Sequence, residues 1–322
     1  MFMTILNKIF DNWFILIVIV IFTSACLTTK KVKNGEEPNI TEFDAHFKTL
    51  KLADDIGYIR IYSFNTTRPK DFANYFKQLL EAFDTDKVVI DIRNNGGGHI
   101  WASEFLLQTL KRKPITPQNA QFVNSEVTET ICRIHSPSTT MKELDLGNWN
   151  ATLPNIRHTG TAFSIGYPIT PFKELKTFRA ARDYKAVLIT DALCYSASDI
   201  FAAGFQDEKI GKILGVHKNT GAGGANVWTH SLLHHLTQDE TGQSNFFRPL
   251  EYGADIRVAV RRTLRNGINR EVPLEDLGIV PDEVCRLTRD DLLFKNRDLL
   301  ARAKAMLGTV SGSRVAKLQL TE

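Results

Sequence analysis

Short apolar segments that end in glycine-rich turns constrain this chain most. The clearest is "KVVIDIR" (87–93), which breaks into "NNGGG" (94–98) and is followed by a helical pattern from about Ile100 to Leu110. A run of this kind is typical of a strand buried on both faces of a parallel sheet. Upstream, "GYIRIYSF" (57–64) alternates like a strand, and "RPKDFANYFKQLLEAF" (68–83) carries aromatic residues on one helical face. This order of elements predicts a layered α/β domain.

The same pattern resumes in the second half of the chain. "KAVLITD" (185–191) predicts another buried strand, "CYSASDIFAAGFQD" (194–207) a turn and a helix, and "KILGV" (212–216) a further strand before the glycine loop "NTGAGGA". Residues 113–183 between the two halves are irregular, with "GNWNATLPN" as a loop. We interpret them as an insertion that could cover a cleft.

The ends of the chain differ from this core. "NWFILIVIVIF" and "TSAC" at residues 12–26 combine an apolar run of signal-peptide length with small residues before Cys26, as in a bacterial lipobox. The alternative is an uncleaved anchor helix. Either predicts attachment to a membrane and an exported protein of the cell envelope, facing the periplasm or exterior. We expect a polar linker at 27–50, the folded domain at 51–296, and a C-terminal helix and tail at 297–322.

Composition narrows the function classes. The 322 residues are 43% hydrophobic and 24% charged, which is ordinary for a globular protein. A net charge of +4, spread along the chain, gives no argument for nucleic-acid binding. The three cysteines after Cys26 are odd in number and widely spaced, so they predict neither a disulfide framework nor a zinc site. We expect no metal and no cofactor.

Two motifs carry candidate chemistry. The glycines of "NNGGG" can expose backbone N–H groups beside a helix start, where an oxyanion could bind, although a tight turn is the more frequent explanation of such glycines. Ser196 lies where the strand at 185–191 gives way to a helix, so that its hydroxyl could project from the sheet beside the N–H of Ala197. The alternative is that Ser196 or Ser198 caps the helix.

In this order, the segments "DIRNNGGG", "SASDIFAAGFQD" and "GIVPD" resemble the S41 family of serine peptidases, the tail-specific or C-terminal processing proteases. The likeness covers about Gly57 to Val284. It implies a ClpP/crotonase-like α/β core, Ser196 as the nucleophile, and an oxyanion held by the N–H groups of Gly97 and Ala197. Asp207 matches the acidic residue that closes the helix of the motif.

The general base does not carry over from the resemblance. The processing-protease branch has a lysine in a "GxxTxGKG" loop, where this chain has "GVHKNTGAGGANVWTH" with Gly or Ala in the lysine's place. The tricorn-like branch has a histidine in "DxHT", which "DAHF" at 44–47 matches except for the Thr. Because histidine titrates near neutral pH, it suits this role. We rank His230 first, then His99, then Lys218, then His46.

These observations predict an exported serine peptidase that cleaves peptides or proteins through an acyl-enzyme at Ser196. The rival is a binding protein of the same fold that has lost the base. Arginines of "IRVAVRRTLRNGINR" could grip a peptide's terminal carboxylate, or could line a solvated edge strand.

Overall fold

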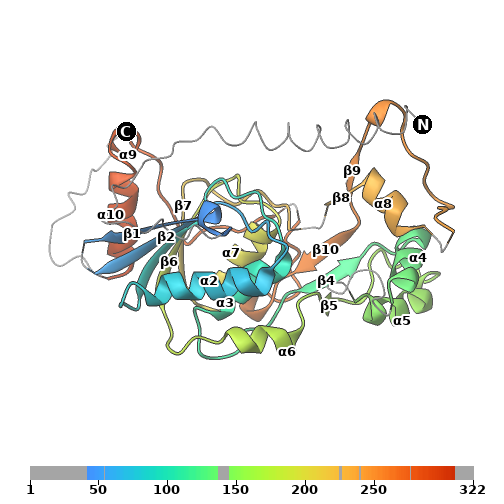
Figure 1. Cartoon of the computed structure of the whole chain (residues 1–322), viewed down its shortest axis with the longest axis horizontal. Helices are drawn as coiled ribbons and strands as arrows, with labels where there is room; N and C mark the ends of the chain where they lie inside the picture. Colours follow the sequence, from blue (N-terminus) through green and yellow to red (C-terminus); the bar gives the residue numbers. More distant parts are fainter. Residues whose placement is uncertain are drawn as a thin grey trace, which may run out of the picture. The chain divides into compact units, whose positions relative to one another are not determined.

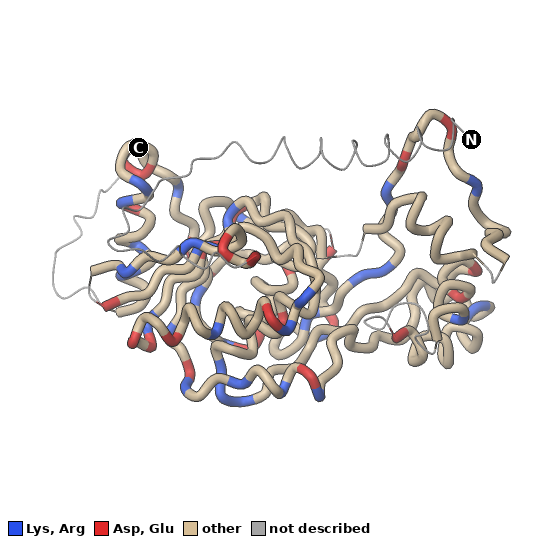
Figure 2. Tube along the Cα trace, viewed as in Figure 1, with Lys and Arg blue, Asp and Glu red and all other residues tan. Residues whose placement is uncertain are grey.

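The computed structural model (Figure 1) describes residues 42–308, except 54, 137–144, 225–226, 239–240 and 276. The predictions for residues 1–26 and for Cys26 lie outside these residues. No helix within them is long and apolar enough to cross a membrane. Basic and acidic side chains alternate along the described chain without a separate region of either sign (Figure 2).

The core is a six-stranded sheet in the order β1-β2-β3-β6-β7-β11. All neighbouring pairs are parallel except β1 with β2. Its strands are β1 Phe47–Leu52, β2 Ile56–Ile61, β3 Lys87–Asp91, β6 Lys185–Thr190, β7 Gly211–Gly215 and β11 Glu283–Val284. The apolar runs predicted as buried strands are therefore confirmed as β3, β6 and β7.

Helices cover both faces of this sheet (Figure 1). One face packs against α2 Pro69–Glu81, α3 Ile100–Gln108 and α7 Ala197–Asp207. The other packs against Leu299 and Ala303 of α10 Arg297–Met306. Successive strand residues point to opposite faces of the sheet. Ile90 packs on the face that α2, α3 and α7 cover, and Val89 packs on the face that α10 covers. Burial on both faces explains why these strands are apolar throughout.

A second hydrophobic cluster forms around the region that we interpreted as an insertion. Its elements are β4 Asn119–Phe122, α4 Glu126–Ile134, α5 Gly147–Ile156, β8 Val227–Thr229, α8 His230–Leu236 and the start of β10 Arg261–Leu264. β4 pairs with β10 and with β5 Tyr167–Pro168, and β8 pairs with β9 Arg257–Ala259. Short helices α6 Phe172–Leu175 and α9 Arg289–Leu293 complete the order.

Two expectations differ from the structure. β1 lies inside the stretch assigned to the linker, so the folded domain extends further toward the N-terminus than residue 51. "GNWNATLPN" is helix α5, because Trp149 and Leu153 are buried one turn apart despite Pro154. The helix expected from residue 297 is α10, and positive φ at Lys295 and Asn296 separates it from α9.

Candidate active site

The candidate site lies where the chain leaves the carboxyl ends of β3 and β6. Parallel strands bring these ends to one edge of a sheet, where α/β proteins usually bind their ligands. The loop Asn94–Gly98 follows β3, and the turn that ends at Ser196 follows β6. Two contacts join them: Asp191 accepts hydrogen bonds from the N–H of Asn94, and Tyr195 donates its N–H to the Asn95 carbonyl at 3.2 Å.

Ser196 adopts an unusual backbone conformation for a residue with a side chain. Its φ is +57° and its ψ is −120°, immediately before the first residue of α7. Although Ser196 occupies the N-cap position, its side chain makes no capping hydrogen bond, so the capping alternative fails for this serine. Within the described part of the chain its hydroxyl has no hydrogen-bond partner. Strain of this kind at a strand-to-helix turn is characteristic of exposed nucleophiles.

Gly97 lies directly against this turn. A Cβ atom at Gly97 would be 2.7 Å from Ser196 Cβ and 3.0 Å from the Ala197 nitrogen, and φ at Gly97 is +102°. Both facts require glycine here, and they place the Asn94–Gly98 loop against the Ser196 turn. The Ala197 N–H makes no backbone hydrogen bond that would occupy it.

The Gly97 N–H has a different role from the one that the resemblance implies. It donates to Asn95 Oδ1 at 2.9 Å, while the Asn95 side-chain amide donates to the Ile61 carbonyl at 3.1 Å. These two bonds fix the orientation of the buried Asn95 amide. In this conformation, therefore, Gly97 does not offer its N–H to an oxyanion, and Ala197 is the one predicted donor that remains available.

A buried ionic cluster supports the base of the Asn94–Gly98 loop. Asp91 is fully buried and binds Arg60 at 2.8 Å, Arg93 at 2.7 Å and the Tyr58 hydroxyl at 2.9 Å. Burial opposes ionisation of Asp91, but the two arginines outweigh it and hold its pKa below the usual value. The "DIR" of the motif thus anchors the loop.

A second buried aspartate, Asp199, lies on the first turn of α7. It accepts hydrogen bonds from the Thr220 hydroxyl at 2.5 Å and from the Gly223 N–H at 2.9 Å. Burial raises its pKa to about 6, against the opposing effect of these donors. Asp199 therefore connects the nucleophile turn to the glycine loop after β7. We did not predict this role, although the acidic residue three positions after Ser196 was a usable signal.

The Tyr195 ring fills the space beside the glycine loop. A Cβ at Gly221 would lie 2.4 Å from Tyr195 Cζ, and one at Gly223 would lie 2.5 Å from Tyr195 Cδ1. Side chains at these positions are thus excluded while the ring stays in place. This explains in physical terms why the loop carries no lysine where the processing-protease motif has one.

The structure does not bring His230, the first-ranked base, to Ser196. His230 begins α8, packs its ring against Phe247 at 5.3 Å, and lines a cavity of about 410 Å³ with His234 and Asp255. These residues adjoin the second hydrophobic cluster, whereas α7 packs on β6, β7 and α3. Lys218 is exposed on a bend after β7.

His99 and His46 both lie at the edge of the sheet where the site forms. His99 caps α3, and its Nδ1 accepts the Trp101 N–H at 3.2 Å. A neutral ring bonded in this way carries its proton on Nε2, so Nε2 cannot accept another. His46 immediately precedes β1, its carbonyl accepts the Tyr62 N–H, and its ring contacts Phe72 at 5.5 Å. No hydrogen bond occupies the His46 imidazole within the described residues.

Asp207 is held at the far end of α7. Eleven residues separate it from Ser196 along the helix, or about 16 Å at the α-helical rise. Its carboxylate binds buried Arg265 at 2.6 and 3.0 Å and accepts the Asn269 amide at 2.7 Å. This geometry makes Asp207 part of an ion pair that fixes the end of α7, and it is not brought to Ser196.

The arginines after residue 256 fit neither of the two predicted alternatives as a group. Arg265 is committed to Asp207, and Arg262 donates to Gln121 at 2.7 Å while its guanidinium lies 3.8 Å from the Phe163 ring centroid. Arg261 is buried, with Glu275 as the acidic group that acts on it. Of the five arginines between residues 256 and 270, only Arg257 and Arg270 are exposed.

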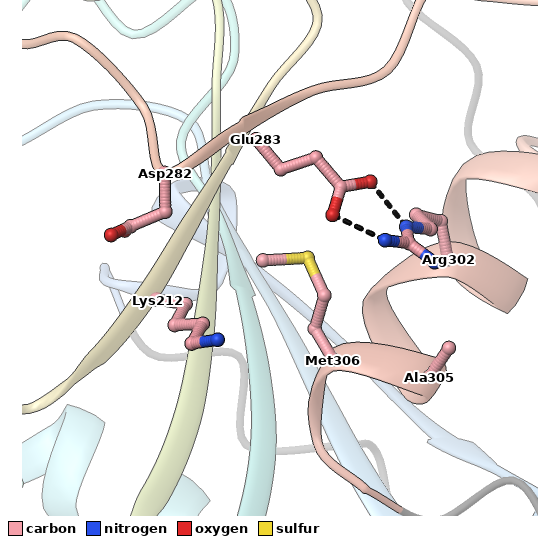
Figure 3. Close-up of a pocket in the computed structure, with 6 residues that line it drawn as sticks. All are labelled: Lys212, Asp282, Glu283, Arg302, Ala305 and Met306. Carbon is pink, nitrogen blue, oxygen red and sulfur yellow. Dashed lines mark hydrogen bonds and ion pairs between the residues drawn. The ribbon is translucent and has the colours of Figure 1, made fainter.

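Another cavity, of about 270 Å³, lies on the opposite face of the sheet (Figure 3). Lys212 of β7, Glu283 of β11 and Arg302 of α10 line it, and the Glu283 carboxylate pairs with the Arg302 guanidinium. Because α10 and α7 cover different faces, this cavity is separate from the Ser196 turn. Among the described residues, no cluster of three or more His, Cys, Asp or Glu side chains is arranged to hold a metal ion.

Solved structures that are similar to this chain have low sequence identity to it. Mature CPAF complexed with lactacystin gives a TM-score of 0.55 at 16% identity, over 82% of this chain and 55% of that one. Mature CPAF alone gives 0.54 at 16%, over 83% and 55%. The photosystem II D1 C-terminal processing protease gives 0.42 at 18%, over 74% and 47%. The chain therefore spans about half the length of these proteins.

The sequence comparisons identify the family. No curated protein matches the sequence. The model of peptidase family S41 matches residues 55–283, which include both loops of the candidate site. Together with the structural neighbours, this match confirms the predicted ClpP/crotonase-like α/β core. The chain belongs to peptidase family S41.

Proposed function

We propose that this protein is a serine peptidase that cleaves peptide or protein substrates through an acyl-enzyme at Ser196. The observation that carries the proposal is the Ser196 turn: positive φ, a hydroxyl without a capping role, and the adjacent Ala197 N–H. In this reaction Ser196 Oγ attacks the scissile carbonyl and forms an ester. The leaving amine takes a proton, and water then hydrolyses the ester.

A serine-directed fluorophosphonate tests the nucleophile. Ser196→Ala should abolish labelling, whereas Ser198→Ala should retain it. Ser198 is a suitable matched control because its hydroxyl lies two residues away but is fully buried, with no hydrogen-bond partner. Labelling of Ser196→Ala at the wild-type rate, with both proteins folded, would refute the assignment.

For the general base, the placements favour His46 over the higher-ranked candidates. His46 belongs to the folded domain, and its imidazole is uncommitted, unlike that of His99. No hydrogen bond joins the His46 imidazole to Ser196 among the described residues, so catalysis requires the two side chains to come into contact.

Single variants of the four candidates distinguish them. His46→Ala should reduce peptide turnover by about 10²–10⁴-fold. His230→Ala should leave turnover near the wild-type value, because the His230 ring packs on Phe247 and not beside Ser196. If His46→Ala is fully active while His99→Ala or Lys218→Ala is inactive, the base is misassigned but the peptidase remains.

The competing function is a peptide-binding protein without catalysis. Two observations favour it: no base reaches the Ser196 hydroxyl in this conformation, and Asn95 occupies the Gly97 N–H. Calorimetry with peptide libraries decides between the two. Saturable binding without cleavage, together with an unlabelled Ser196, would support the binder.

We also propose that the protein is exported and lipidated at Cys26, on the basis of the apolar run that ends in "TSAC". Mass spectrometry of the mature N-terminus tests this. A lipidated N-terminal Cys26 is expected, and a chain that begins at Met1 with an unmodified Cys26 would contradict it.

A further inference from the structure

Asp199 connects two separate parts of the site, the Ser196 turn and the glycine loop after β7. Its carboxylate accepts the Thr220 hydroxyl and the Gly223 N–H, both from the glycine loop after β7. The backbone N–H groups of Ala222 and Ser196 also act on this carboxylate and lower its pKa, against the effect of burial. One fully buried side chain thus fixes the nucleophile and the loop that packs on Tyr195.

Each of these hydrogen-bond donors is electrically neutral. Glu275, from another segment, carries the same sign and acts on Asp199, and the buried Cys194 thiol of the Ser196 turn interacts with Asp199 as well. Ionised Asp199 is therefore unfavourable for folding, in agreement with its raised pKa. A buried charge without a cation partner is a poor stabilising device, which favours a functional role.

We propose that the ionised carboxylate of Asp199 is a positioning residue, which holds the Ser196 turn and the Thr220–Gly224 loop in the arrangement that reacts. This inference rests on the proposed function of Ser196. A carboxylate accepts all of these bonds at once, whereas a carboxylic acid or an amide turns a donor toward one of the N–H groups. Protonation of Asp199, or its replacement by Asn, should therefore displace the loop and the nucleophile.

The ratio of two labelling rates tests the proposal. The second-order rate constant for fluorophosphonate labelling of Ser196 is measured for wild type and Asp199→Asn from pH 5 to pH 8. Above pH 7, wild type should react about tenfold faster or more, because displacement of a reacting group is costly. Near pH 5, where Asp199 is protonated, the ratio should approach one. Titration of the general base cancels in this ratio.

A matched control separates positioning from general destabilisation. Asp291 is also a buried aspartate that accepts a threonine hydroxyl and two backbone N–H groups, from Thr288 and Leu299, but it lies beside α9. Asp291→Asn should leave the labelling rate of folded protein unchanged at every pH. A pH-independent ratio for Asp199→Asn, or an equal effect of Asp291→Asn, would overturn the proposal.

Amide hydrogen exchange provides a readout that does not depend on catalysis. At pH 8, the Gly223 amide should exchange about tenfold faster in Asp199→Asn than in wild type, because it loses its acceptor. Equal exchange would overturn the positioning role. If exchange accelerates but wild type is never labelled, the contacts are confirmed and the proposed function of Ser196 fails instead.

Discussion

Two fully buried aspartates, Asp91 at the end of β3 and Asp199 at the start of α7, support the two halves of the site in opposite ways. Asp91 is neutralised by two arginines, which keep its pKa low. Asp199 is surrounded by neutral donors, and its pKa rises to about 6. The first arrangement stabilises a loop at all ordinary pH values. The second arrangement holds a loop only when Asp199 is ionised, although burial opposes that ionisation.

The largest effect should come from Asp91→Asn. This change leaves the guanidinium groups of Arg60 and Arg93 buried without their carboxylate, which typically costs about 3–5 kcal/mol. Urea unfolding at pH 7 measures it, with Tyr58→Phe as the control, where one hydrogen bond worth about 1 kcal/mol is lost. A loss below about 1 kcal/mol for Asp91→Asn would break the comparison.

The next effect concerns pH and has opposite signs at the two aspartates. Asp199 has a folded-state pKa of about 6 against an ordinary value of 3.8, so the folded state retains a proton that the unfolded chain releases. Stability from this group is therefore lost as pH rises from about 4 to 6, by up to about 3 kcal/mol. The pKa of Asp91 is lowered, so its contribution to stability is present above pH 3.8. That contribution is lost as pH falls through the folded-state pKa.

Urea unfolding of wild type and Asp199→Asn at pH 4 and pH 7 isolates the Asp199 contribution. The stability of the Asn variant relative to wild type should improve on going to pH 7, even as Ser196 becomes less reactive. An unchanged difference between the two pH values would show that Asp199 ionises as easily in the folded protein as in the unfolded chain.

A smaller effect should arise where Tyr195 meets the glycine loop. Gly223→Ala should cost about 1–2 kcal/mol, because the new methyl group would overlap the Tyr195 ring. In a Tyr195→Ala background the cost should fall, which gives a coupling of at least about 0.5 kcal/mol in a double-mutant cycle. Strictly additive changes in the free energy of unfolding would mean that the Tyr195 ring moves aside at no energetic cost.

The smallest effect is expected for the Arg302–Glu283 pair in Figure 3. Both side chains are partly exposed, at 45% and 33%, so water screens their attraction. Glu283→Gln should reduce the free energy of unfolding by less than about 1 kcal/mol in the same assay. A loss as large as that of Asp91→Asn would show that burial does not distinguish the two kinds of arginine pair.

Much of the fold was predictable because burial on both faces leaves a readable pattern in β3, β6 and β7. β1 was missed since it is an edge strand, and most of its side chains are exposed and polar. α5 was missed because a proline and three asparagines make its sequence look like a loop, and the helix depends on tertiary burial of Trp149.

Prediction of the site was limited by loop geometry. The meeting of Gly97 with Ser196 followed from motifs at the ends of neighbouring strands. Sequence could not show that Asn95 would take the Gly97 N–H, since this depends on one side-chain rotamer. The placement of His230 failed because the chain beyond Gly224 continues into the second cluster instead of returning to the sheet.

The contact between Tyr195 and the glycine loop has a consequence for evolution. An ancestor with a lysine at the position of Gly223 could not also have had the Tyr195 ring in its present place, because the two side chains would overlap. Neither single substitution would restore the older arrangement, because the first change alone produces either an overlap or an unfilled gap. The loss of lysine would then be difficult to reverse, and lineages with this tyrosine would have to recruit their base from elsewhere in the fold.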